Sequence, residues 1–173
     1  MTASAHMTRG TTVATLAFMA GAAAADDTTA ERAMGAFSDN CFSPFMTAAR
    51  VSERFASNDV RVDFYDLDPF SKADVSKAAG RVTPGTDRRC EVAFDGDHAG
   101  VAADVAVAAL TREGILTDAA LQSTHRGART SGTALLAARQ LNPRRIAVVH
   151  VGTRPGPNGI ETFMNVERLR PQK

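Results

Sequence analysis

Two groups of side chains in this sequence offer carboxylates for chemistry. Asp66 and Asp68 follow an apolar run with a spacing that phosphoryl transfer can use, but Pro69 comes next, and a solvated turn uses the same residue types. The run from Asp95 to His98 offers two carboxylates and an imidazole, yet it lacks the further, regularly spaced oxygen ligands of a calcium loop. The sequence therefore predicts no metal site and no cofactor.

The histidines are the other candidates for acid-base chemistry. His150 lies within an apolar run and His125 within a polar loop, and neither has an acidic neighbour in sequence. A hydrolase or transferase would need a site assembled from distant loops. A concave pocket with His98, His125 or His150 beside a carboxylate would favour that alternative, whereas isolated histidines would disfavour it.

The charge of the chain is balanced overall but is separated along the sequence. Lys and Arg number 20 against 19 Asp and Glu, a net charge of +1. Residues 26–118 hold 17 acidic and 10 basic residues, a net charge of −7, and residues 119–173 hold 2 and 9, a net charge of +7. The balance excludes a globally basic nucleic-acid binder, and the low aromatic content of 6% argues against stacking platforms for bases.

Five arginines of the basic part are expected to gather at one end of a sheet. Guanidinium groups bind carboxylates and phosphates with two parallel hydrogen bonds, which makes an anionic ligand, an acidic partner or a lipid headgroup the corresponding hypothesis. The alternative is that the basic strands face the acidic remainder of the same chain. The candidate anion-binding residues are Arg139, Arg144, Arg145, Arg168 and Arg170.

Cys41 and Cys90 are the two cysteines of the chain, and they predict one disulfide. Cys41 shares a helical stripe with Phe37, and Cys90 alternates with Val92 on a strand, so both sulfurs are expected to point to the core. Buried free thiols and a nucleophilic thiol are the alternatives, but no Cys-x-x-Cys spacing supports zinc or redox chemistry.

The first 25 residues resemble an export signal. Arg9 precedes an apolar stretch over 13–21, and the small residues Ala22 to Ala25 suit cleavage after Ala25. The alternative is an N-terminal helix that stays in the fold. The apolar stretch is shorter than the roughly 20 residues that a membrane-spanning helix needs, so we expect no transmembrane segment in the mature chain and a periplasmic or secreted location.

Three helices are expected in the mature chain. The first covers about 28–40, beginning at the capping-box pattern of Thr28 and Glu31. The second begins at Ser43 with a proline in its first turn and ends near Asn58. The third is capped by Asp97 and ends at Gly114. Its expected apolar side consists of Val101, Val105, Ala108 and Ala109.

Alternating apolar residues predict the strands, the first of which lies at 60–65. Segments 81–83 and 88–94 flank a turn at 84–87 and predict a hairpin, while three strands at 133–140, 145–152 and 160–169 predict an antiparallel meander. Residues 146–149 are apolar on both faces and should form a central strand covered by helices. The fold class is therefore α+β, an antiparallel sheet of about five to six strands packed by two N-terminal helices and one central helix, in a single domain over 26–173.

The signal, the cysteine in the first helical region, the run from Arg88 to Phe94 and the last strand from Gly159 to Met164 together resemble small uncharacterised exported proteins of alphaproteobacteria. The resemblance implies a periplasmic setting and no catalytic residues. We expect a non-enzymatic binding or accessory module for an anionic ligand or an envelope protein. The alternatives are the small hydrolase or transferase and a structural subunit, for which a large exposed apolar patch would be the sign.

Overall fold

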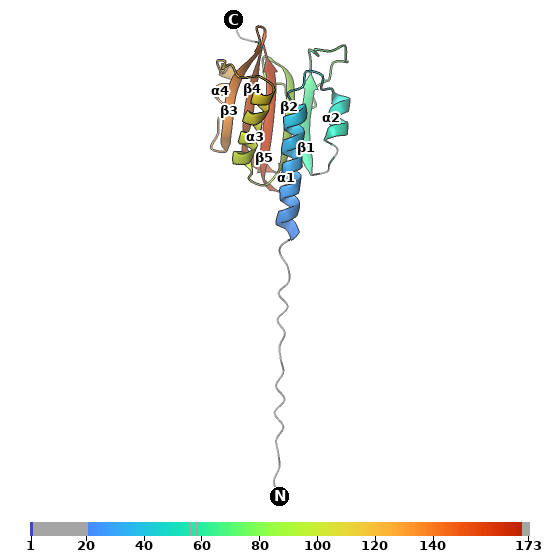
Figure 1. Cartoon of the computed structure of the whole chain (residues 1–173), viewed down its shortest axis with the longest axis vertical. Helices are drawn as coiled ribbons and strands as arrows, with labels where there is room; N and C mark the ends of the chain where they lie inside the picture. Colours follow the sequence, from blue (N-terminus) through green and yellow to red (C-terminus); the bar gives the residue numbers. More distant parts are fainter. Residues whose placement is uncertain (2–20, 56, 58, 171–173) are drawn as a thin grey trace.

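The chain folds as a five-stranded antiparallel sheet with its helices arranged around it (Figure 1). The computed structural model describes residues 1, 21–55, 57 and 59–170. The helices are α1 (Gly21–Asn40), α2 (Ala48–Arg54), α3 (Ala99–Arg112) and α4 (Ser123–Arg126), and the strands are β1 (Val60–Asp66), β2 (Thr86–Asp95), β3 (Thr133–Asn142), β4 (Arg145–Gly156) and β5 (Gly159–Leu169). The α+β class and the antiparallel sheet are confirmed.

The sheet has the order β1-β2-β5-β4-β3, and every neighbouring pair is antiparallel. The three C-terminal strands form the predicted meander. The chain passes from β2 through α3 to β3 at the far edge, which leaves β5 in the middle of the sheet. Asp66, Arg88 and Arg168 occupy one row of this register, so the ends of β1 and β5 and the start of β2 meet at one end of the sheet.

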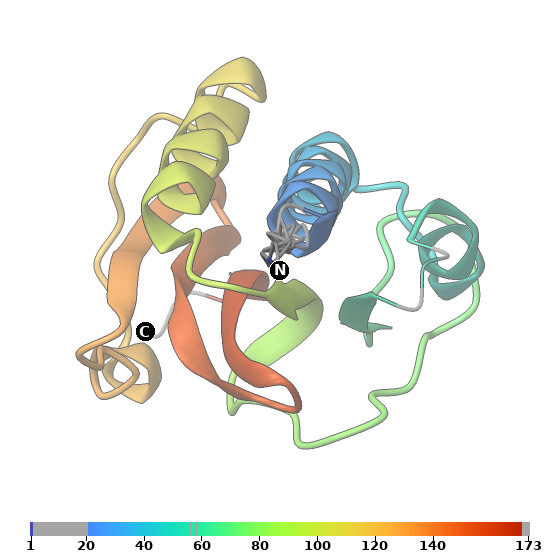
Figure 2. The same cartoon turned by 90° about the horizontal axis from the view of Figure 1, so that it is seen from below.

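One face of the sheet packs against α1 and α3, which lie side by side over it (Figure 2). Side chains alternate along each strand, so Cys90 of β2, Val166 of β5 and Val149 of β4 point to the same side. These residues and Phe37 of α1 belong to the main core and are buried. As predicted, β4 lies inside the sheet and is covered by a helix.

The buried side of α3 differs in part from the expected one. Ala102 and Ala106 lie against the sheet, whereas Val101 is 59% exposed. The small side chains allow the helix backbone to approach β4 and α1 closely, and valines on that side would hold it further away. The apolar stripe predicted for α3 is therefore right only in part, because Ala109 is buried and Val105 packs against the core, whereas Val101 and Ala108 are exposed.

Two local predictions in the first half of the chain are wrong. The helix expected from Ser43 begins at Ala48 instead, because Thr47 is its N-cap and accepts a hydrogen bond from the Arg50 amide at 3.3 Å. Residues 81–83 form no strand, since β1 occupies the place beside β2 that a hairpin partner would take.

The helix α1 includes the residues on both sides of the predicted cleavage point after Ala25. Residues 2–20 of the predicted signal lie outside the described residues. The first side chain of α1 that is described as buried is Ala30. Among the residues that the structure describes, no helix is both long and apolar enough to cross a membrane.

The segment between α3 and β3, which includes α4, covers part of the opposite face of the sheet. A second core cluster forms there from Ile146, Val148 and Leu169, with Leu121 of the covering segment packed against it. The remainder of this face is polar, and its arginines and carboxylates form ion pairs across neighbouring strands.

Cys41, just beyond α1, lies at disulfide distance from Cys90 of β2, with 5.4 Å between the Cα atoms and the bond formed. Both residues are buried in the main core. The bond ties the chain after α1 to the sheet across a sequence separation of 49 residues.

Reduction of this disulfide should lower the free energy of unfolding by about 4 kcal/mol, because a cross-link over a loop of this length restricts the unfolded chain. The measurement is urea unfolding with and without dithiothreitol. A variant carrying Cys41→Ser and Cys90→Ser is the control, and its stability should not respond to the reductant. Equal stability of the oxidised and reduced wild-type protein would contradict the prediction.

Candidate functional site

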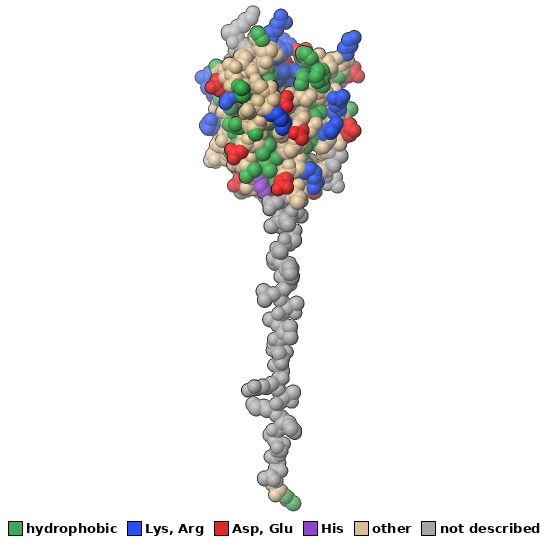
Figure 3. Space-filling model, viewed as in Figure 1, with side chains coloured by type: hydrophobic (Ala, Val, Ile, Leu, Met, Phe, Trp, Pro, Cys, Tyr) green, Lys and Arg blue, Asp and Glu red, His purple; other side chains and the backbone are tan. Residues whose placement is uncertain are grey.

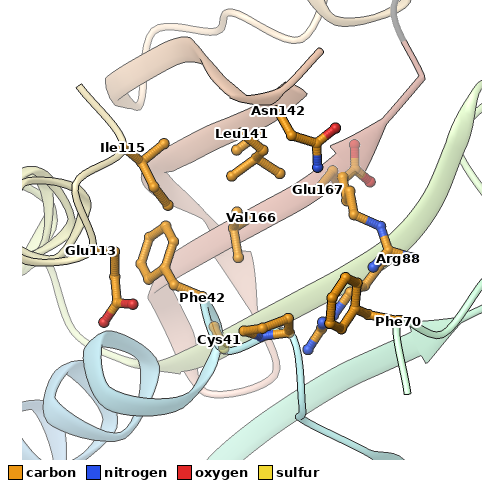
Figure 4. Close-up of a pocket in the computed structure, with 13 residues that line it drawn as sticks. Cys41, Phe42, Phe70, Arg88, Glu113, Ile115, Leu141, Asn142, Val166 and Glu167 are labelled. Carbon is orange, nitrogen blue, oxygen red and sulfur yellow. The ribbon is translucent and has the colours of Figure 1, made fainter. Parts of the chain in front are cut away.

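A cavity of about 330 Å³ lies between the helix-covered face of the sheet and the chain that follows α1 (Figure 4). Its wall is mostly apolar. Phe42 and Pro44 come from the chain after α1, Phe70 from the loop between β1 and β2, and Leu141 and Val166 from β3 and β5. The polar residues in its lining are Arg88, Glu113, Asn142, Glu167 and Arg168.

Arg88 is the cation in this wall with the most unused hydrogen-bonding capacity. It lies on the helix-facing side of β2, two residues before Cys90, and is 6% exposed. Its Nη2 donates to the carbonyl oxygen of Ser43 at 2.7 Å, its Nη1 lies 3.8 Å from Asp66 Oδ2, and its buried Nε has no hydrogen-bond partner among the described residues. A guanidinium has five N–H donors, so several of them have no hydrogen-bond partner among the described residues.

Burial lowers the pKa of Arg88 to about 10, although the charge of Asp66 opposes this effect. The side chain therefore remains protonated at neutral pH. Its guanidinium carbon lies 5.4 Å from the centre of the Phe64 ring, a cation–π contact that fixes the side chain from the β1 side.

The two charged ends of the cavity differ in sign. Figure 4 shows Arg88 and Glu113 on opposite sides of an apolar floor that includes Val166. Glu113 pairs with Arg112 at 3.7 Å, and its side chain is 38% exposed. An anion with one charged head would be attracted at the Arg88 side, whereas a second negative charge would meet Glu113.

Arginines and aspartates at the same end of the sheet form a closed group, which we call the arginine–aspartate cluster. Its members are Asp66, Asp68, Asp87, Arg145, Arg168 and Arg170. Arg168 binds Asp66 through Nη2 at 2.8 Å and Asp87 through Nε at 2.6 Å. Arg145 Nε lies 2.8 Å from the other oxygen of Asp87, and hydrogen bonds from Arg170 and Arg145 lower the pKa of Asp68.

The five arginines predicted to gather are thus only partly brought together. Arg145, Arg168 and Arg170 join the cluster, where three aspartates from the acidic part of the chain balance their charge. Arg139 pairs with Asp118 at 2.5 Å outside the cluster. The Arg144 side chain is exposed and has no ion pair within the described part of the chain.

Sequence reasoning did not select Arg88, although one signal was available. Cys90, Val92 and Phe94 alternate on the core face of β2, and Arg88 continues the same alternation. A charged residue on the buried side of a strand requires a partner or a function, because burying an unpaired charge is costly.

A second buried polar group lies on the opposite face of the sheet. Glu167 Oε2 is 2.5 Å from His125 Nε2, and Glu167 Oε1 accepts a hydrogen bond from Arg89 Nε at 2.7 Å. Burial alone would raise the pKa of Glu167, but the hydrogen bond from His125 and the charge of Arg89 outweigh it and lower the pKa. Burial also raises the pKa of the nearby Tyr65 to about 12.

The surroundings of the three histidines bear on the hydrolase or transferase alternative. His125 does lie beside a carboxylate, but both side chains are at least 93% buried, and Thr124 Oγ1 lies 2.9 Å from the other ring nitrogen of His125. His150 contacts Thr133 Oγ1 at 3.1 Å, and burial lowers its pKa. His98 precedes α3 and lies against Phe94. The described residues contain no group of three or more side chains suited to a metal ion.

No protein-family model matches the chain, and comparisons with curated proteins and with solved structures also find no match. The residues of the cavity and the charges around it are therefore the basis for a functional conclusion.

Glu167→Gln should lower the free energy of unfolding by about 3 kcal/mol at neutral pH, because it removes the buried carboxylate that pairs with both Arg89 and His125 and leaves Asp63 as the carboxylate beside Arg89. The folded-state pKa of Glu167 is lower than its ordinary value of 4.5. The stabilisation is therefore fully present above that value and is lost as the pH falls through the folded-state pKa.

Urea unfolding of both proteins at pH 7 and at a series of pH values below 4.5 measures this effect, and the difference between them should shrink with acidity. Asp118→Asn is the control, since Asp118 is 85% exposed and its pair with Arg139 should contribute little. A Glu167→Gln variant as stable as the wild type at pH 7 would show that the buried group is unimportant.

Proposed function

We propose that this protein is an exported, non-enzymatic binding module that holds a small amphipathic organic anion in the cavity beside Arg88. The ligand has one carboxylate-type head and an apolar body. The cavity volume of about 330 Å³ lies at the lower end of the range of small-molecule sites. A periplasmic or secreted location is part of the proposal, and the disulfide is compatible with an oxidising compartment.

The single observation that carries the proposal is the buried guanidinium of Arg88 beside the apolar part of the cavity wall. Its Nε has no hydrogen-bond partner among the described residues, and its ion pair with Asp66 is long at 3.8 Å. A carboxylate would accept two parallel hydrogen bonds from such a group and would satisfy donors that are otherwise buried and unused.

The apolar floor supports a ligand with a hydrocarbon or aromatic body. Phe42, Leu141 and Val166 offer surface on which such a body would leave water, which is favourable by about 25 cal/mol for each Å² that is buried. Glu113 on the far side disfavours a second carboxylate. The preferred ligand is therefore a monocarboxylate.

The proposal predicts that the protein binds octanoate more tightly than octanol or octanedioate. Arg88→Met should lower the affinity for octanoate about tenfold or more, because a hydrogen bond to a charged group contributes about 1.5–3 kcal/mol. The same variant should bind octanol with the affinity of the wild type. An unchanged affinity for octanol would show that the cavity of the variant is intact. Isothermal titration calorimetry with the three probes makes this comparison.

Arg144→Gln is the matched control, since Arg144 is an exposed arginine that is not part of the cavity lining. Its affinities for all three probes should equal those of the wild type. The proposal is wrong if the wild type does not distinguish octanoate from octanol, or if Arg88→Met retains the distinction.

A further inference from the structure

Exposed apolar side chains gather beside the mouth of the cavity. Phe45 is 54% exposed, Phe70 73% and Val75 57%, and Leu67 is exposed to 39%. They come from two separate parts of the chain, before α2 and after β1, which the contact between Phe45 and Phe70 joins with a ring-centre distance of 6.0 Å. Large apolar side chains that are grouped and exposed usually mark an interaction surface.

Exposed basic side chains lie in the loop that carries part of this apolar group and in a neighbouring turn. Lys72, Lys77 and Arg81 lie in the loop between β1 and β2, and Arg144 lies in the turn between β3 and β4. All four are exposed, and none has an ion pair within the described ranges. Asp74 is an exposed acid in the same loop, while Asp68 is engaged by Arg145 and Arg170.

These residues share one end of the molecule. Asp66 and Arg168 lie in one row of the sheet, and Leu169 pairs with Ile146, so the β1–β2 loop and the β3–β4 turn leave the sheet at the same end. Figure 3 shows basic and apolar side chains together at this end of the molecule. We call this surface the docking end, and it consists of Phe45, Leu67, Phe70, Lys72, Val75, Lys77, Arg81 and Arg144.

We propose that the docking end binds the surface of an anionic lipid bilayer. The rings of Phe45 and Phe70 would enter the interfacial region, and the basic side chains around them would contact the headgroups. Apolar anchors with neighbouring lysines and arginines are the general means by which folded proteins attach to such surfaces, and each basic residue near the surface strengthens the attachment.

Charge favours a bilayer over a second copy of this chain. A symmetric contact would bring the basic ring of one copy against the same ring of the other, and like charges across an interface oppose association. An anionic surface complements the charges of Lys72, Lys77, Arg81 and Arg144, which share the docking end with the apolar group. Long basic side chains can also lie along the interface with their charged ends in water.

The position of Phe70 connects the docking end with the cavity. Phe70 belongs to both surfaces, since it lines the cavity and is 73% exposed. This connection identifies the ligand as a single-chain amphiphile that enters the cavity from the bilayer. The identification of the ligand rests on the proposed function. The docking surface itself does not require that the cavity be occupied.

Flotation with vesicles of phosphatidylcholine containing phosphatidylglycerol tests the docking end, with pure phosphatidylcholine vesicles for comparison. The wild type should bind the anionic vesicles, bind pure phosphatidylcholine weakly and be released by salt. Two double variants, Phe45→Ser with Val75→Ser and Lys72→Glu with Lys77→Glu, should each reduce the partition coefficient about tenfold or more. These four positions are not part of the cavity lining.

The control for the apolar variant is Val101→Ser with Val107→Ser, which removes two exposed valines from α3. The control for the charged variant is Arg32→Glu with Arg54→Glu, since both arginines are exposed and lie by Val60, at the other end of β1. Both controls should bind anionic vesicles as the wild type does. No binding by the wild type, or equal loss in variants and controls, would overturn the proposal.

Two further measurements distinguish the other outcomes. Sedimentation velocity without lipid detects self-association. A dimer of the wild type that dissociates in the variant with Phe45→Ser and Val75→Ser would overturn the bilayer assignment in favour of a second copy of the chain. Octanoate titration of the docking variants should give wild-type affinity. Vesicle binding without octanoate binding would overturn only the proposed function, and octanoate binding without vesicle binding would overturn only the docking end.

Discussion

The disulfide between Cys41 and Cys90 determines where the chain after α1 lies, and the cavity depends on that placement. It holds this chain against β2, where Phe42 and Pro44 form one wall and the Ser43 carbonyl accepts a hydrogen bond from Arg88. The same chain brings Phe45 to Phe70 at the cavity mouth. One covalent bond thus positions the apolar wall, the buried cation and the exposed aromatic pair. A protein of this size gains a large share of its stability from such a bond.

The separation of charge along the sequence has a structural explanation. Asp66, Asp68 and Asp87 of the acidic part balance Arg145, Arg168 and Arg170 of the basic part, because the register of β1, β2 and β5 places them at one end of the sheet. On the other face, Glu161 of β5 binds both Arg61 and Arg154. Most of the two opposite charges are therefore neutralised within the fold. Arg88 keeps unused donors in the cavity, and Lys72, Lys77, Arg81 and Arg144 are exposed without an ion pair among the described residues.

The sequence was sufficient for the features that depend on local periodicity, and insufficient for those that depend on tertiary packing. The meander over β3 to β5 and the approach of Cys41 to Cys90 follow from alternation and helical spacing. The strand predicted at 81–83 fails because β1, and not a hairpin partner, pairs with β2. The buried side of α3 was identified only in part, since alanines and valines are both apolar and the close approach of β4 selects the smaller ones. Arg88 was missed because Arg89 follows it in the sequence and points to the opposite face of the sheet. Two adjacent arginines resemble a stretch of chain that is exposed to solvent.

The energetics of the cavity and the docking end suggest why the two would occur together. Moving the apolar body of an amphiphile from a bilayer into an apolar cavity changes its burial little, so the hydrophobic term contributes little to the exchange. The head group then determines whether the ligand moves from the bilayer into the cavity. On transfer it exchanges contacts with water and neighbouring lipid head groups for hydrogen bonds from the unused donors of Arg88, in surroundings less polar than water. A cavity of this kind without a docking surface would have to take its ligand through water, where the exposed apolar body makes transfer slow. A single buried cation in a largely apolar cavity is therefore most effective when the mouth of that cavity faces the membrane.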